Sequence, residues 1–153
     1  MISVEILTYE PDEISSALLS LLTHEFSFST SITILTQTPK TEVDIALVDP
    51  FFEWLSTSWL DANRIKILLV PSRLVTAFGY EIVAETRAQY VIISTTKLKQ
   101  QTVVRVLRHE IGRVIGLGDH LDCVMSRYFV EDPVFCISCR AKLLEHGIAW
   151  RPN

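Results

Sequence analysis

Three cysteines and a histidine toward the end of the chain have the spacing of a zinc site. His120, Cys123, Cys136 and Cys139 form two close pairs in the pattern H-x2-C-x12-C-x2-C. Both pair spacings suit tetrahedral Zn²⁺, and soft thiolates select zinc over magnesium or calcium. Four protein ligands leave no open coordination position, so we predict a structural site. The alternative is a set of buried free cysteines beside a surface histidine, and His120 could be a neighbour of the site instead of a ligand.

A second group of chemistry-bearing residues lies just before the first. His109 and Glu110 are followed by Arg113, Gly116 and Asp119. Residues four apart lie on one face of a helix, so His109 and Arg113 should share a face. Two histidines at this spacing could bind one Zn²⁺, but an arginine keeps its proton and has no lone pair for a metal. The group therefore has the outline of a zinc site with a cation at a ligand position.

Together these residues resemble the archaemetzincin family of metzincin zinc proteases. Metzincins carry H-E-x-x-H-x-x-G-x-x-H, followed by a methionine turn. On that frame His109 is the first zinc ligand, Glu110 is the general base and Gly116 is the glycine of the turn. Arg113 and Asp119 occupy the second and third ligand positions and do not match.

The resemblance continues through the cysteines, over about residues 109–144. Cys123-Val124-Met125 matches the C-x-M of the family, which makes Met125 the residue of the methionine turn. Cys136 to Cys139 matches its C-x-x-C. In the family this place resembles a Cys₄ zinc site, so the resemblance implies that His120 replaces one of the cysteines.

The two ligand substitutions predict that the catalytic zinc is absent. A catalytic zinc needs three protein ligands and an open water site, and His109 with Asp119 supplies two at best. We expect Arg113 to pair with Asp119 or Glu110, filling the place of the ion with a charge-assisted contact. Two alternatives remain: solvated surface residues on an ordinary helix, or a metal gathered by His109, Asp119 and His120 in a shifted register.

The periodicity of the sequence indicates which elements position these residues. An apolar stripe from Val103 to Ile115 predicts the active-site helix over about residues 98–115. Two further helices are predicted, over residues 11–24 and about 137–147. Runs of alternating or continuous apolar residues predict strands over residues 2–7, 27–36, 43–48, 65–70 and 90–94, the third of them more buried than those before it.

An additional short edge strand is expected at residues 73–78. In metzincins an edge strand beside the active-site helix binds extended substrates by strand addition. The resemblance assigns that role here to residues 73–80.

The predicted fold is α+β, a minimal metzincin-like (zincin) domain. It has a twisted mixed sheet, two main helices and a small zinc-stapled C-terminal subdomain. We predict a single domain over residues 1–153, divided into an upper subdomain, 1–116, and a lower one, 117–153. The lower part can bury little core of its own, so a structural zinc is physically sensible there.

Composition excludes several classes of function. The chain has 153 residues, of which 48% are hydrophobic, and a formal net charge of −4. There is no basic run, so no nucleic-acid partner is expected. There is no apolar run of membrane-spanning length and no pattern of a signal peptide, so no membrane partner is expected and the cytoplasm is the predicted location.

The function predicted from sequence is that of a zinc-protease homologue with one structural zinc and no peptidase activity. Glu110 is then a vestigial base, and His109, Arg113 and Asp119 are vestigial catalytic-zinc positions. One alternative is an active zinc-dependent peptidase with atypical ligands. A second is a module that uses the old cleft to bind a peptide or a protein segment.

Overall fold

The computed structural model describes residues 1–36, 44–61, 63–96, 98–119, 123–126 and 134–152. Its helices are α1 (Glu13–His24), α2 (Asp49–Ser58), α3 (Gln100–Val114) and α4 (Ile137–Glu145). Its strands are β1 (Ser3–Thr8), β2 (Ser29–Ile34), β3 (Ile45–Leu47), β4 (Arg64–Val70), β5 (Arg73–Val75), β6 (Glu81–Ile82), β7 (Ala84–Arg87) and β8 (Tyr90–Ser94). None of the helices in this described part is long and apolar enough to cross a membrane.

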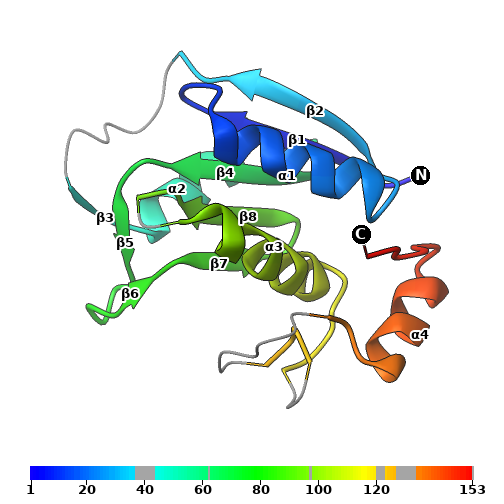
Figure 1. Ribbon diagram of the computed structural model, residues 1–153. Helices are drawn as coiled ribbons and strands as arrows, with labels where there is room; N and C mark the ends of the chain where they lie inside the picture. The colour runs from blue at the N-terminus through cyan, green and yellow to red at the C-terminus, as the bar shows by residue number, and fades with distance from the viewer. Residues whose placement is uncertain (37–43, 62, 97, 120–122, 127–133, 153) are drawn as a thin grey trace.

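The main sheet has five strands in the order β2-β1-β4-β8-β7 (Figure 1). Neighbouring strands pair in parallel except for β7, which is antiparallel to β8. Helices α1 and α3 lie on one face and α2 lies on the other. The predicted mixed sheet with two main helices is therefore confirmed.

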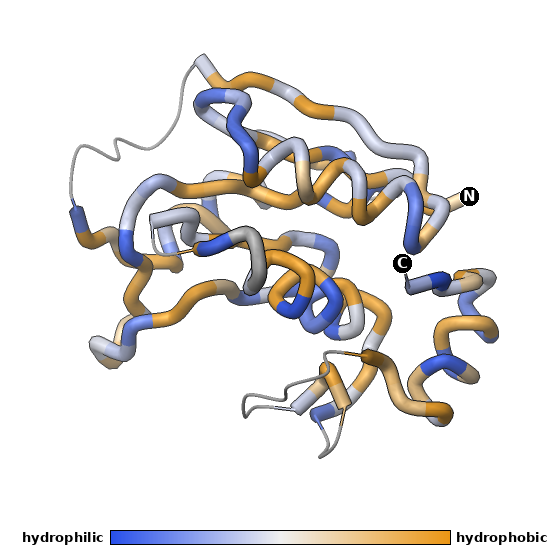
Figure 2. The backbone as a smooth tube through the Cα atoms, in the orientation of Figure 1, coloured by the Kyte–Doolittle hydropathy of each residue, from blue (hydrophilic) through white to orange (hydrophobic). Residues whose placement is uncertain are grey.

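Alternation along the strands builds a hydrophobic core on each face of this sheet. Val4 and Ile6 of β1 face α1 and α3, whereas Leu7 faces α2. Successive side chains of a strand point to opposite faces, so a strand covered on both sides must be apolar at nearly every position. The central strands β1, β4 and β8 are accordingly buried at nearly every position, and β4 is drawn largely in orange in Figure 2.

The active-site helix α3 is held to the sheet by the predicted apolar stripe. Val103, Leu107 and Ile111 are fully buried against the sheet and α1. The helix ends at Gly116, which has φ +87°. The N–H groups of Gly116 and Leu117 donate to the carbonyls of Arg113 and Gly112 at 3.0 and 2.9 Å. This is a Schellman motif, which needs a left-handed residue at that place, so Gly116 is the predicted turn glycine.

The edge strand beside α3 is not the predicted one. Residues 73–75 form β5, which pairs with β3 and β6 in a separate three-stranded sheet. The edge of the main sheet is β7, residues 84–87, and β7 contacts α3. The prediction missed β7 because its sequence, Ala-Glu-Thr-Arg, lacks an apolar alternation, and pairing with β8 is what makes it a strand.

The prediction that the third strand is more buried than those before it was also wrong. Ile45 and Leu47 of β3 are 49% and 52% exposed. The reason is position, because β3 lies at the edge of the small sheet rather than inside the main one.

The end of the chain is joined to α1 and α3 by a buried ion pair. Arg108 of α3 donates from Nε and Nη2 to the two carboxylate oxygens of Glu25, at 2.9 and 2.8 Å. Trp150 donates from its indole N–H to the same carboxylate at 3.1 Å. The side chains of Arg108 and Glu25 are 7% and 2% exposed, so α1, α3 and the C-terminal segment share one desolvated contact.

Candidate active-site cleft and cysteine cluster

The second half of α3 carries the residues of the candidate active site. His109 and Arg113 lie one turn apart, and the Nε of Arg113 donates to the Nε2 of His109 at 2.9 Å. They share a helix face, as the spacing predicts. The Nδ1 of His109 donates to the carbonyl of Val124 at 2.9 Å, which fixes the tautomer of the ring. The lone pair on Nε2, the one that could bind a metal, is therefore occupied by the guanidinium.

Asp119 completes this arrangement from the loop after α3. The Nη2 of Arg113 contacts both carboxylate oxygens of Asp119, at 3.2 and 3.5 Å. The expected ion pair between the two substituted positions is present, although one nitrogen makes both contacts instead of the two-nitrogen fork. The two side chains are 39% and 23% exposed, so the pair is worth about 1 kcal/mol or less.

These residues do not fit a catalytic zinc. A cationic guanidinium lies against the imidazole nitrogen and the carboxylate that would have to face the ion, and it supplies no ligand of its own. The site has a charge-assisted hydrogen-bond chain, His109–Arg113–Asp119, in the place where the family resemblance puts a metal.

Glu110 lies in the same cleft but is buried. It is 5% exposed, and the hydroxyl of Thr86 on β7 donates to its Oε2. Burial raises the pKa of the Glu110 carboxyl, and the hydrogen bond from Thr86 and the charge of Arg113 offset only part of that effect. A raised pKa is typical of a general base, but it is equally the consequence of a carboxyl group enclosed between a helix and a strand.

The cleft between α3 and β7 consists of two depressions that meet at Arg113. The first has a volume of about 270 Å³ and includes Glu110 and Ser126 in its lining. Two walls face each other across it, formed by Ile82, Val83 and Ala84 on one side and by Arg105, His109 and Arg113 on the other. The second depression, of about 430 Å³, extends past Thr86 and Ala88 on one side and past Arg113 and Asp119 on the other.

Met125 packs beneath the cleft, against α3. It is fully buried, and a Cβ added to Gly112 would lie 2.3 Å from its sulfur. The methionine therefore uses the space that a glycine leaves on the underside of the helix. The methionine-turn assignment stays a prediction, because ordinary core packing would make the same contacts.

The three cysteines come together in a cluster, as their spacing predicts. The Sγ atoms of Cys123, Cys136 and Cys139 all lie within 4.8 Å of one another. Cys123 and Cys139 are buried, and the backbone N–H of Cys136 donates to the sulfur of Cys123 at 3.4 Å. Three converging thiols fit a zinc ion chemically. His120, the predicted fourth ligand, lies outside the described residues.

The environment of the cluster favours a thiolate at Cys136. Burial raises the pKa of this thiol, but hydrogen bonds from the Ser138 hydroxyl and from the backbone and thiol of Cys139 lower it to about 6. Burial and the neighbouring thiols of Cys123 and Cys136 raise the pKa of Cys139 instead. A thiolate is the species that binds zinc, and the lowered pKa of Cys136 favours that species at this position.

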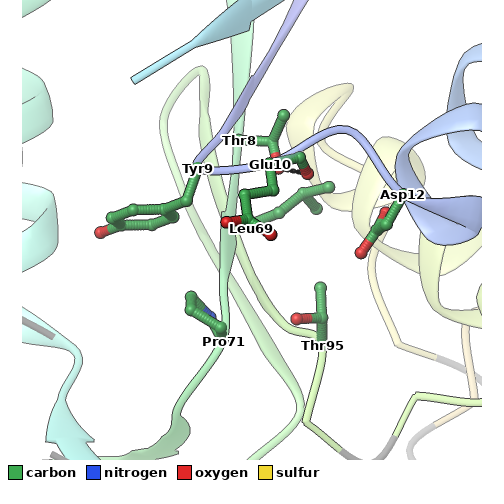
Figure 3. Close-up of a pocket in the computed structure, with 7 residues that line it drawn as sticks. All are labelled: Thr8, Tyr9, Glu10, Asp12, Leu69, Pro71 and Thr95. Atoms are coloured by element: carbon green, nitrogen blue, oxygen red, sulfur yellow. Dashed lines mark hydrogen bonds between the residues drawn. The ribbon is translucent and has the colours of Figure 1, made fainter. Parts of the chain in front are cut away.

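A separate depression lies at the carboxyl ends of β1, β4 and β8 (Figure 3). Its volume is about 350 Å³, and three of its polar side chains bond to backbone groups. Thr8 donates to the Glu10 carbonyl at 2.8 Å, Thr95 donates to the Val70 carbonyl at 3.3 Å, and Asp12 caps α1. Local structure therefore accounts for these polar contacts.

Several features of the cleft were not apparent from the sequence. Thr86 and Arg105 are ordinary surface residue types, and the Val124 carbonyl is a backbone group that any residue would supply. The one available signal was the spacing of Arg105, His109 and Arg113, four residues apart on one helix face.

Comparison with solved structures identifies the fold of the chain. The chain is similar to the crystal structure of an archaemetzincin from Methanopyrus kandleri, with a TM-score of 0.71, 17% identity and 94% of each chain covered. It is also similar to an archaemetzincin from Archaeoglobus fulgidus complexed with malonate, with a TM-score of 0.73, 16% identity, 92% of this chain and 99% of that one. A zinc-dependent peptidase from Methanocorpusculum labreanum gives a TM-score of 0.67 at 14% identity, over 92% of this chain and 100% of that one.

By sequence, no family model and no curated protein matches the chain. The structural likeness nevertheless extends over almost the whole chain, and the fold is archaemetzincin-like. At these identities the likeness defines the fold, and the chemistry of the site must be argued from the residues of this chain.

Proposed function

We propose that this protein is an archaemetzincin-like domain that has lost the catalytic zinc and keeps a structural one. It does not hydrolyse peptides, and it uses the cleft between α3 and β7 to bind an extended peptide or protein segment. The observation that carries the proposal is the 2.9 Å hydrogen bond from Arg113 to His109 Nε2, because it occupies the lone pair that a catalytic zinc would need.

The structural zinc is supported by the cysteine cluster. Three sulfur atoms within 4.8 Å of one another, two of them buried, supply three of the four ligands of a closed tetrahedral site. Cys123, Cys136 and Cys139 would hold the ion, with His120 as the fourth ligand. Bound there, zinc would cross-link the segment after α3 to α4. Reduced thiols are the reason to place the protein in the cytoplasm.

The segment-binding role is supported by the position of β7. As the last strand of the main sheet, β7 pairs with β8 along one edge, and its other edge has no strand partner among the described residues. An extended segment can add to such an edge through backbone hydrogen bonds. The depressions beside β7 give room for the side chains of that segment.

The test is the amount of zinc per chain, by elemental analysis of protein purified without added metal. We expect one zinc per chain, lost in Cys136→Ala and kept in His109→Ala. Two zincs, one of them lost in His109→Ala, would contradict the proposal and favour the atypical zinc peptidase. A chelator-sensitive peptidase activity that disappears in Glu110→Gln would point the same way.

A further inference from the structure

The wall of the cleft formed by α3 is cationic. Arg105, His109 and Arg113 follow one another at four-residue intervals and all line the first depression. His109 accepts a hydrogen bond at Nε2 and donates one at Nδ1, so its ring is neutral in this arrangement. The formal positive charge of the wall therefore comes from the two guanidinium groups.

The nearby carboxylates leave a cation facing the cleft. Glu110 is buried and receives a hydrogen bond from Thr86. Of the Arg113 guanidinium nitrogens, Nη2 is the one that contacts Asp119, at 3.2 and 3.5 Å. The Nη1 group of Arg113 has no hydrogen-bond partner in the described part of the chain, and the side chain is 39% exposed. A guanidinium in this position presents N–H donors in the geometry that matches a carboxylate.

The position of Arg113 indicates which kind of carboxylate it would bind. Arg113 lines both depressions, so the cleft continues past it in either direction along β7. A segment that lies along the whole cleft passes Arg113 with an internal residue, not with its end. The cleft therefore fits an acidic side chain better than a C-terminal carboxylate.

We propose that the segment bound along β7 carries an aspartate or glutamate side chain, whose carboxylate is received by Arg113 with Arg105 farther along the same wall. This inference rests on the proposed segment-binding function and names the chemistry of the segment. A catalytic zinc would polarise a peptide carbonyl, whereas the guanidinium that stands in its place selects an anion.

The probe is a set of fluorescent heptapeptide pools with both termini blocked. The flanking positions are randomised without acidic residues, and the central residue is glutamate, glutamine or lysine. Binding to the full-length protein is measured by fluorescence anisotropy. We expect the glutamate pool to bind about tenfold more tightly than the glutamine pool, and the lysine pool to bind more weakly than both, because one charge-assisted hydrogen bond distinguishes them.

Variants separate the role of Arg113 from a general effect of charge. Arg113→Gln should reduce binding of the glutamate pool to the level of the glutamine pool, and Arg113→Lys should give an intermediate value. The matched control is Arg151→Gln, which removes the same charge from an exposed residue of the C-terminal segment and should change nothing. Circular dichroism establishes that each variant is folded before it is used.

The failing outcomes distinguish this inference from the function on which it rests. Equal binding of the glutamate and glutamine pools would overturn the acidic preference and leave segment binding intact. A glutamine pool with a free C-terminus that binds as tightly as the glutamate pool would overturn the assignment to a side chain. Failure of the protein to bind any pool would overturn both proposals.

Discussion

A single residue, Arg113, determines the chemistry of the cleft. Its guanidinium donates to His109 and Asp119, the side chains at the first and third ligand positions of the metzincin pattern. The arginine thus holds the loop after α3 against the helix, as a metal ion bound at this place would. Unlike a metal ion, a guanidinium cannot coordinate a water molecule and activate it.

Restoring the ligand at this position should restore a metal site. In Arg113→His, two imidazoles one turn apart and the Asp119 carboxylate form a set of three zinc ligands. We expect elemental analysis to find one more zinc per chain in this variant than in the wild type. Arg113→Gln is the control and should gain none. A zinc content that stays at the wild-type value in Arg113→His would mean that Asp119 or His109 cannot reach the ion.

Glu110 makes the stability of the protein depend on pH. Its pKa is raised in the folded state because the carboxyl is buried, so ionising it costs more free energy in the folded chain than in the unfolded one. The protonated Glu110 carboxyl contributes its full share of stability below the unfolded-state pKa of 4.5. That stability is lost as the pH rises through the folded-state pKa. Glu110→Gln should therefore have a higher Tm than the wild type at pH 7, and the difference should shrink toward zero below pH 4.5. A difference that does not change with pH would show that the charge is not the cause.

At the scale of elements, the cleft depends on close contact between α3 and the segment beneath it. Gly112 lets Met125 reach the helix backbone, and Leu117 packs into the same space. Three residues, one from the helix and two from the segments that follow it, thus pack together against α3. A side chain at position 112 would separate these segments.

This contact should appear as an energetic coupling between the two positions. Gly112→Ala places a Cβ at 2.3 Å from the Met125 sulfur, and the overpacking should cost about 1–3 kcal/mol despite the better helix propensity of alanine. Met125→Ala alone should cost about 2–5 kcal/mol through the cavity it leaves. In the double variant each change relieves the other, so urea denaturation should give a cost well below the sum of the two. Additive costs would contradict the contact.

At the scale of the whole molecule, the buried pair Arg108–Glu25 joins segments that are distant in sequence. It connects α1, α3 and Trp150 of the C-terminal segment, whose position beside α1 is visible in Figure 1. The guanidinium of Arg108 also lies over the indole ring of Trp150, 5.1 Å from its centroid. Breaking this pair should affect the entire domain.

Glu25→Gln should therefore lower the free energy of unfolding strongly. It removes the charge of the carboxylate that Arg108 contacts in the interior, which should cost about 3–5 kcal/mol. The matched control is Asp49→Asn, which removes one of the two carboxylates that contact the exposed Arg87 and should cost less than about 1 kcal/mol. Urea denaturation of both variants checks the expectation. Equal costs would show that burial of the Arg108–Glu25 pair adds nothing to its contribution to the free energy of unfolding.

The sequence by itself determined most of the elements and the composition of both candidate sites. The strand at Tyr90–Ser94 agrees with its prediction, and the other main strands and the helices differ by a few residues at their ends. These elements have strong hydrophobic periodicity, which is a local property. The spacings of His109 with Arg113 and of the cysteines were equally local, because a helix turn and a short loop fix which side chains can meet. The division of the chain into parts before and after residue 116 stays a prediction.

Only the tertiary structure decided which strand borders the cleft and what Arg113 contacts. The tetrapeptide of β7 becomes a strand through its pairing with β8, and residues 73–75 join another sheet because β3 and β6 are their partners. Neither preference is encoded within the strand itself. Likewise, the sequence allowed Arg113 to pair with Asp119 or Glu110. In the structure Glu110 is buried and bonded to Thr86, and the partners of Arg113 are Asp119 and His109. Such choices depend on distances between segments far apart in the chain, which periodicity and spacing do not specify.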